Sequence, residues 1–209
     1  MLPRIFCLVS HSNDLTVLPG LYAAGVTGFQ VRDKLLADRP LVELTRRVRH
    51  AVPQAMIVVN DRPDIALASG ADGVHLGADD VPVAAARRLA PGLLIGATCR
   101  DRDEVLRAAK AGADYAGFGP IFTSTSKPGL PAALGLAAVS DASGVLPLIG
   151  IGGVGPANAG EVIAAGAYGV AAISGIWDAV DPCAGAARLA AEVACAATPA
   201  VGAPLGVGA

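Results

Sequence analysis

The chain has 209 residues, of which 53% are hydrophobic and 16% are charged, and its formal net charge is −2. This length favours one domain with a large core, and the composition is typical of a parallel sheet covered by helices. The sequence has no basic block and no apolar run near the ~20 residues of a membrane span, which argues against nucleic-acid and membrane partners.

The first residues lead straight into an apolar run and lack the layout of a signal peptide. The sequence also contains four cysteines, and no two of them form a Cys-x-x-Cys pair. Free thiols are typical of a reducing compartment, so we expect a cytoplasmic protein.

Eight short apolar runs alternate with alanine- and leucine-rich segments at helical spacing. The predicted strands are 5–10, 28–33, 56–60, 73–76, 93–98, 115–119, 146–151 and 169–174. The predicted helices are 15–24, 39–51, 63–69, 83–89, 103–111, a short one from 136, 158–165 and 185–197. This alternation predicts a single-domain α/β protein, a closed (β/α)8 TIM barrel over 1–197, followed by a disordered tail over 198–209.

Two further observations support the barrel. Gly25, Gly70, Gly112 and Gly166 each end a predicted helix within a similar short motif, which indicates repeated turns with a left-handed glycine. The turn over 11–14 lacks the glycine-rich motif that an open dinucleotide-binding sheet normally carries after its first strand.

In such a barrel, catalytic groups lie at the carboxyl ends of the strands. The second strand ends in Gln30, Arg32 and Lys34, which alternation places on one face. An amide and two cations at the barrel mouth would bind an anionic substrate with hydrogen-bonding groups. The alternative is an exposed loop with ordinary charge.

The third and fourth strands end in further polar residues: Asn60 and Asp61, then Asp79 and Asp80. Magnesium prefers one or two carboxylates together with water and phosphate oxygens, so Asp61 and Asp80 predict a Mg²⁺ site. The alternative is that these aspartates cap the helices that follow. His75, inside the fourth strand, is expected to be a structural group.

The later strand ends are rich in hydroxyls and glycines. Thr98 offers a hydroxyl after the fifth strand with Arg100 beside it, and Cys99 is expected to be a bystander. The polar residues of the loop after the sixth strand include Ser124, Thr125, Ser126 and Lys127. Their hydroxyl and ammonium groups can donate hydrogen bonds to a phosphate, so the loop predicts a phosphate-binding site. The alternative is a flexible loop. Gly153, Ile173 and Ser174 follow the last two strands, where this fold commonly binds phosphate.

Together these residues predict a barrel that binds a metal-bound diphosphate and a monophosphate. No strong general base or nucleophile is evident in the sequence, so activation of a leaving group would be the main catalytic device.

Several ordered motifs resemble the thiamine phosphate synthase family. They are QVRDK at 30–34, NDR at 60–62, GADGVHLG at 70–77 with Asp80, GPIF at 119–122 with Lys127, and IGG at 151–153. The resemblance implies coupling of hydroxymethylpyrimidine diphosphate to a thiazole phosphate, with or without a carboxyl group, and release of diphosphate. It also implies a dissociative path in which magnesium and cations withdraw the diphosphate.

The resemblance implies a role for each matching residue. Gln30, Arg32, Lys34, Asn60 and Lys127 would bind the pyrimidine diphosphate, and the three cations among them would assist catalysis. Asp61 and Asp80 would hold Mg²⁺, and Thr98 stands where the family usually has serine. Ser124 and Ser126, where threonines are common, would bind the thiazole phosphate with Gly153, Ile173 and Ser174, and Thr125 lies between them.

Two alternatives remain open at this point: a thiazole tautomerase-like isomerase, and a non-catalytic barrel that binds a thiamine precursor. The tautomerases resemble this chain but use a histidine where it has Arg100, and they tend to lose the lysine found here as Lys34. Both differences favour the synthase. The oligomeric state does not follow from the sequence, and a homodimer is one expectation.

Overall fold

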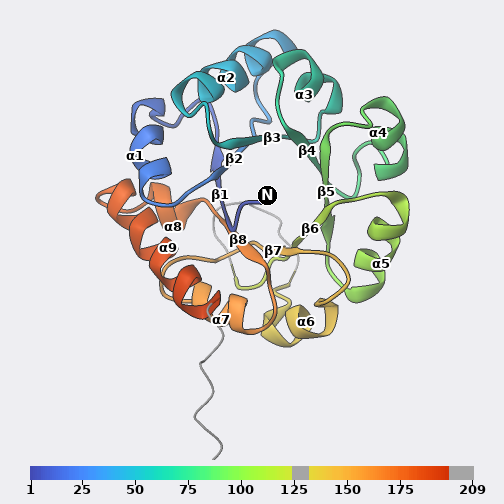
Figure 1. Cartoon of the computed structure of the whole chain (residues 1–209), viewed down its shortest axis with the longest axis vertical. Coiled ribbons are helices and arrows are strands. Elements are labelled where there is room, and N and C mark those ends of the chain that lie inside the picture. The colour runs from blue at the N-terminus through green and yellow to red at the C-terminus, as the bar shows by residue number, and fades with distance from the viewer. Residues whose placement is uncertain (124–131, 198–209) are drawn as a thin grey trace, which may run out of the picture.

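The computed structural model describes residues 1–123 and 132–197 (Figure 1). Eight parallel strands form a closed barrel in the order β1 to β8, and β8 pairs with β1. Figure 1 looks down this barrel and shows the helices as an outer ring. The predicted TIM barrel is therefore confirmed. The predicted tail and the predicted phosphate-binding site over 124–127 lie outside the described residues.

The strands are β1 Ile5–Val9, β2 Gly28–Val31, β3 Met56–Asn60, β4 Gly73–Leu76, β5 Leu94–Cys99, β6 Tyr115–Phe118, β7 Leu148–Gly150 and β8 Gly169–Ala172. A 3-10 turn, η1, covers Leu15–Val17. The helices are α1 Leu18–Ala23, α2 Asp38–Ala51, α3 Pro63–Ser69, α4 Val83–Leu89, α5 Arg102–Ala111, α6 Gly135–Ala142, α7 Ala159–Ala164, α8 Ser174–Trp177 and α9 Pro182–Ala197. None of the helices in the described part of the chain is long and apolar enough to cross a bilayer.

Predicted strands 1, 5, 6 and 7 end one residue away from the observed ends, and the ends of β2 and β8 differ by two residues. β2 stops at Val31 because the backbone turns at Asp33, whose side chain accepts the N–H groups of Leu35 and Leu36. Arg32 and Lys34 are therefore loop residues, and they do not continue the strand face of Gln30. β8 stops at Ala172, and α8 begins at Ser174.

The short helix α8 was not predicted, because its sequence continues the apolar pattern of β8. A contact between distant parts of the chain holds it in place. The indole nitrogen of Trp177 donates to the carbonyl of Leu8, at the end of β1, at 2.7 Å. Ile176 is fully buried in the core beside it.

Alternate strand residues fill the inside of the barrel, and the others pack against the helices. The inner cluster contains Phe6, Leu8, Val58, Tyr115, Ile149 and Ala171. Glycines in β5 and β6 make room for the larger inner rings. A Cβ on Gly96 would lie 2.1 Å from Cζ of Tyr115, and a Cβ on Gly117 would lie 2.5 Å from Cε1 of His75.

Two Arg–Asp pairs repeat at the amino ends of the strands. Arg49, at the end of α2, pairs with Asp72, which accepts the N–H of Ile57 at 2.7 Å. Arg87 in α4 pairs with Asp114 at 2.6 Å, and the N–H of Ile95 donates to Asp114 at 2.7 Å. Two of the repeated glycine motifs are thus followed by an aspartate that ties a helix to the start of a strand.

We expect Asp114→Ala to lower the free energy of unfolding by about 1–3 kcal/mol, because the backbone N–H of Ile95 loses its acceptor in a partly buried site. Urea unfolding followed by circular dichroism would measure the change. Asp103→Ala, in the exposed first turn of α5, is the control. Equal effects of the two substitutions would contradict a structural role for the Arg87–Asp114 pair.

Candidate active site

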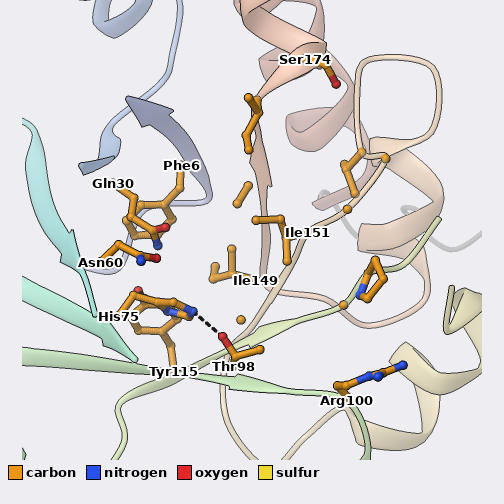
Figure 2. A pocket seen from close by; sticks show the side chains of 18 residues that line it. Phe6, Gln30, Asn60, His75, Thr98, Arg100, Tyr115, Ile149, Ile151 and Ser174 are labelled. Carbon is orange, nitrogen blue, oxygen red and sulfur yellow. Dashed lines mark hydrogen bonds between the residues drawn. The ribbon is translucent and has the colours of Figure 1, made fainter. Parts of the chain in front are cut away.

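A pocket opens at the carboxyl ends of the strands, with residues from all eight strands or their following loops around it (Figure 2). Six predicted site residues line it: Gln30, Asn60, Thr98, Gly153, Ile173 and Ser174. The structure therefore brings together residues that are far apart in the chain, as the barrel prediction required.

Aromatic rings line the deep part of this pocket. Phe6 and Tyr115 stack with ring centroids 5.9 Å apart and an interplanar angle of 11°. The His75 ring lies 5.6 Å from Tyr115. Burial raises the pKa of Tyr115 well above its ordinary value, so the phenol keeps its proton. These faces are suited to a flat aromatic ligand.

His75 joins this aromatic group to Thr98. Its Nε2 lies 3.0 Å from the Thr98 hydroxyl, a contact drawn in Figure 2, and its Nδ1 lies 3.2 Å from the Tyr115 hydroxyl. Both ring nitrogens thus have partners, as expected of a structural histidine. The ring also lines the pocket, which the sequence did not predict.

Two amides form one wall of the pocket. Gln30 is 7% exposed and comes from β2, and Asn60 is the last residue of β3. Figure 2 shows both side chains on the same side of the pocket, with Ser174 on the opposite side. Amides can both donate and accept, so this wall can orient a heterocycle by its ring nitrogens and amino groups.

A cluster of charged side chains, Lys34, Asp61 and Asp80, lies next to this wall. Lys34 forms an ion pair with Asp61, and the Asp61 and Asp80 carboxyl groups are hydrogen-bonded to each other. Asp80 also accepts the N–H of Gly77 at 2.7 Å. The helices that follow, α3 and α4 within residues 1–123, have no side-chain N-cap, so neither aspartate is the helix cap considered above.

The two carboxyl groups differ in acidity. Burial and the adjacent Asp61 carboxylate raise the pKa of Asp80. Burial also raises the pKa of Asp61, but hydrogen bonds from Asp80 and Lys34 and the charges of Lys34 and Arg32 outweigh it, so the pKa is lowered. One proton held between two adjacent carboxyl groups relieves the repulsion of their charges, and a bound cation can do the same.

The donor set fits magnesium. Oxygen ligands from one or two carboxylates, completed by water and phosphate, are what Mg²⁺ prefers. Within residues 1–123 and 132–197 no cluster of three or more His, Cys, Asp or Glu side chains exists, so these residues do not form a closed protein cage. Asp61 and Asp80 would hold the ion and leave positions open for a substrate.

Glycines line the opposite rim. Gly152 and Gly153 have φ of 93° and 64°, and a Cβ on Gly153 would lie 2.6 Å from the carbonyl oxygen of Thr123. The backbone is therefore in close contact with the start of the loop after β6. A side chain at either position would be strained, which leaves this rim as bare backbone beside Ser174.

The sequence did not single out Phe6, Tyr115, Ile149 or Ile151, although all four line the pocket. Their inward position follows from strand alternation once one inward residue per strand is known. Arg100 also lines the pocket, and its Nη2 donates to the carbonyl of Ala132 at 3.3 Å. Burial raises the pKa of Cys99 to about 12, so its thiol stays protonated, in line with the bystander interpretation.

The loop that carries Lys34 is organised by Asp33. Its carboxylate accepts hydrogen bonds from the backbone of His11 at 2.9 Å, Leu35 at 3.0 Å and Leu36 at 3.1 Å. Burial raises the pKa of Asp33, but these hydrogen bonds and one from the His11 ring outweigh it and lower the pKa to about 2.

Because the folded-state pKa of Asp33 is below its ordinary 3.8, its stabilising effect is complete above that value and is lost as the pH falls toward 2. We expect the stability difference between wild type and Asp33→Asn to shrink across this window. Chemical unfolding from neutral pH down to about pH 2 would measure it. A difference that is independent of pH would contradict the lowered pKa.

Comparison with known proteins identifies the family of this chain. The family model described as thiamine monophosphate synthase matches residues 5–176. The thiamine-phosphate synthase of Chlorobium luteolum is 44% identical over 185 residues, which cover 85% of this chain and 87% of that protein. A thiamine biosynthesis bifunctional protein ThiM/ThiE of Symbiobacterium thermophilum is 48% identical over 195 residues, which cover 90% of this chain but 40% of that protein.

Among solved structures, thiamine phosphate pyrophosphorylase from Pyrococcus furiosus superposes with a TM-score of 0.84 at 30% identity. The match covers 92% of this chain and 96% of that one. The match to the family model runs from the start of β1 into α8, and it includes every residue that lines the pocket as well as Lys34, Asp61 and Asp80. The chain belongs to the thiamine monophosphate synthase family.

Proposed function

We propose that this chain is a thiamine-phosphate synthase, which joins hydroxymethylpyrimidine diphosphate to a thiazole phosphate and releases diphosphate. The observation that carries the proposal is the position of the Lys34–Asp61–Asp80 cluster beside a pocket with an aromatic floor and an amide wall. The cluster suits a diphosphate, and the pocket suits the flat ring attached to it. The comparisons support the same reaction class.

The neutral and the charged residues of the site would have different roles. Gln30 and Asn60 would orient the pyrimidine by hydrogen bonds while its ring lies against the aromatic floor. Lys34 and Arg32 would stabilise the negative charge that grows on the diphosphate as its carbon–oxygen bond breaks. Mg²⁺ held by Asp61 and Asp80 would neutralise diphosphate charge when bound.

The second substrate would enter from the glycine rim. Gly153, Ile173 and Ser174 line the pocket, and they would bind the thiazole phosphate together with Ser124, Thr125, Ser126 and Lys127. Diphosphate would leave first with the electron pair of the carbon–oxygen bond, and the lone pair of the thiazole ring nitrogen would then attack the pyrimidine-methyl cation to form the new carbon–nitrogen bond. No general base is needed, because the attacking nitrogen carries no proton.

The alternatives have less support. A tautomerase must move a proton, and Arg100 stands where the related isomerases have histidine. A non-catalytic binder has little use for a lysine paired with a metal-binding carboxylate. The homodimer and the cytoplasmic location expected from the sequence stay predictions.

Asp61→Asn is the sharpest test of the metal assignment. Asp61 is the only non-glycine residue with positive φ in the described ranges, at 68°, and asparagine tolerates this conformation while carrying no charge. We expect formation of thiamine phosphate from the two phosphorylated halves with Mg²⁺ to fall at least about a hundredfold, because diphosphate loses charge neutralisation.

Asp64→Asn in α3 serves as the control, since Asp64 pairs with Arg62 outside the pocket. Thermal unfolding of both variants should match that of wild type. Full activity of Asp61→Asn at saturating substrates and Mg²⁺ would show that the metal assignment is wrong. Failure of wild-type protein to form any product from fresh substrates would refute the proposed function itself.

Gly77→Ala should move the Asp80 carboxylate without disturbing the fold. A Cβ on Gly77 would lie 2.8 Å from Asp80 Oδ2, and that carboxylate can rotate away. We expect the Mg²⁺ concentration for half-maximal activity to rise about tenfold, with an unchanged KM for the thiazole phosphate. Gly92→Ala is the control, because a Cβ there meets no atom within 4 Å. An unchanged Mg²⁺ requirement would argue against Asp80 as a ligand.

A further inference from the structure

Asp33 is a carboxylate with a buried side chain, and it lies in the sequence between Arg32 and Lys34, whose charges both lower the pKa of Asp61. The Asp33 side chain is 2% exposed, although it lies in the loop between β2 and α2. One oxygen, Oδ1, accepts the N–H groups of Leu35 and Leu36, and this closes a tight turn directly after Lys34. The other oxygen, Oδ2, faces the loop after β1.

His11 provides both partners of that second oxygen. Its backbone N–H donates to Asp33 Oδ2 at 2.9 Å, and its Nδ1 lies 2.5 Å from the same atom. The His11 side chain is 49% exposed, and His11 does not line the pocket. His11 therefore acts on the site only through Asp33.

Two hydrogen bonds tie this loop to β1 and to the residues directly after β1, one at Arg32 and one at Asp33. The N–H of Arg32 donates to the carbonyl of Val9 at 2.8 Å, and the next residue, Asp33, is held by His11. Lys34 follows at once, and its ammonium group meets the Asp61 carboxylate. The backbone that carries both cations is thus held by contacts within the protein.

We propose that Asp33 and His11 are positioning residues for the diphosphate site: they hold the loop in which Arg32 and Lys34 face Asp61. The inference rests on the proposed synthase function. Ordering a free loop on binding costs conformational entropy for every residue that becomes fixed. A loop ordered in advance avoids that cost and binds its anion more tightly.

The inference separates two functions of the site. The loop that carries Lys34 follows β2, and Gln30 of β2 lies on the other side of the pocket from Ser174 (Figure 2). Loss of the His11–Asp33 contact should therefore weaken diphosphate binding and leave the thiazole phosphate unaffected. A general loss of stability would weaken both.

The test measures binding of inorganic diphosphate with Mg²⁺ by isothermal titration calorimetry, and KM for each substrate in the coupling reaction. We expect His11→Ala to weaken diphosphate binding about tenfold, the size expected for one lost charge-assisted hydrogen bond. KM for the pyrimidine diphosphate should rise in parallel, with KM for the thiazole phosphate unchanged.

A second substitution at position 11 should restore diphosphate binding, for a reason of side-chain geometry. The asparagine Nδ2 is separated from Cβ by one atom, as the histidine Nδ1 is, so His11→Asn can still donate to Asp33 and should restore binding. In His11→Gln the donor lies one atom further out, and it should not restore binding. His50→Ala, in the last turn of α2, is the control for loss of a histidine elsewhere.

Equal binding of diphosphate by wild type and His11→Ala would overturn this inference alone. So would equal weakening of both substrates, or a failure of His11→Asn to restore binding. If wild-type protein binds no diphosphate with Mg²⁺, the proposed function fails and this inference fails with it.

Discussion

The space inside an eight-stranded barrel is the constraint on which the rest of this structure depends. The barrel diameter is set by strand number and tilt, so a large inner side chain needs a small one on a neighbouring strand. Tyr115 fits because β5 carries Gly96 beside it, and His75 fits because β6 carries Gly117. Because the two glycines leave this space, the Tyr115 phenol and the His75 imidazole lie inside the barrel, where they form the floor of the pocket.

The floor in turn determines what the mouth can hold. With Phe6 and Tyr115 stacked below, the pocket is shallow enough for a ligand ring to reach the amides of Gln30 and Asn60 at the strand ends. The charges lie further out, on loops. Apolar and polar recognition are thus arranged in layers along the barrel axis, which suits a ligand with a flat ring at one end and a diphosphate at the other.

The sequence predicted the barrel and much of the pocket wall, since apolar periodicity and strand-end polarity are local signals. The bounds of β3 and β4 agree with the prediction. The floor was missed because alternation gives each apolar strand two opposite faces, and the sequence does not show which face of such a strand points into the barrel. The helix α8 was missed because Trp177 is held by Leu8, 169 residues away. Asp33 looked like one more charge in a polar motif, and only the structure shows its buried side chain and its four contacts with His11, Leu35 and Leu36.

The repeated Arg–Asp pairs have a consequence for the order of folding. Each joins residues that are close in the chain, 23 apart for Arg49 and Asp72 and 27 apart for Arg87 and Asp114. The contact between Arg4 and Tyr168 that joins the first and last strands spans 164 residues. Short loops close at lower entropic cost than long ones, so the two pairs can form while the barrel is still an open sheet. We therefore expect β1 to pair with β8 late in folding, and the complete floor of the pocket requires that pairing.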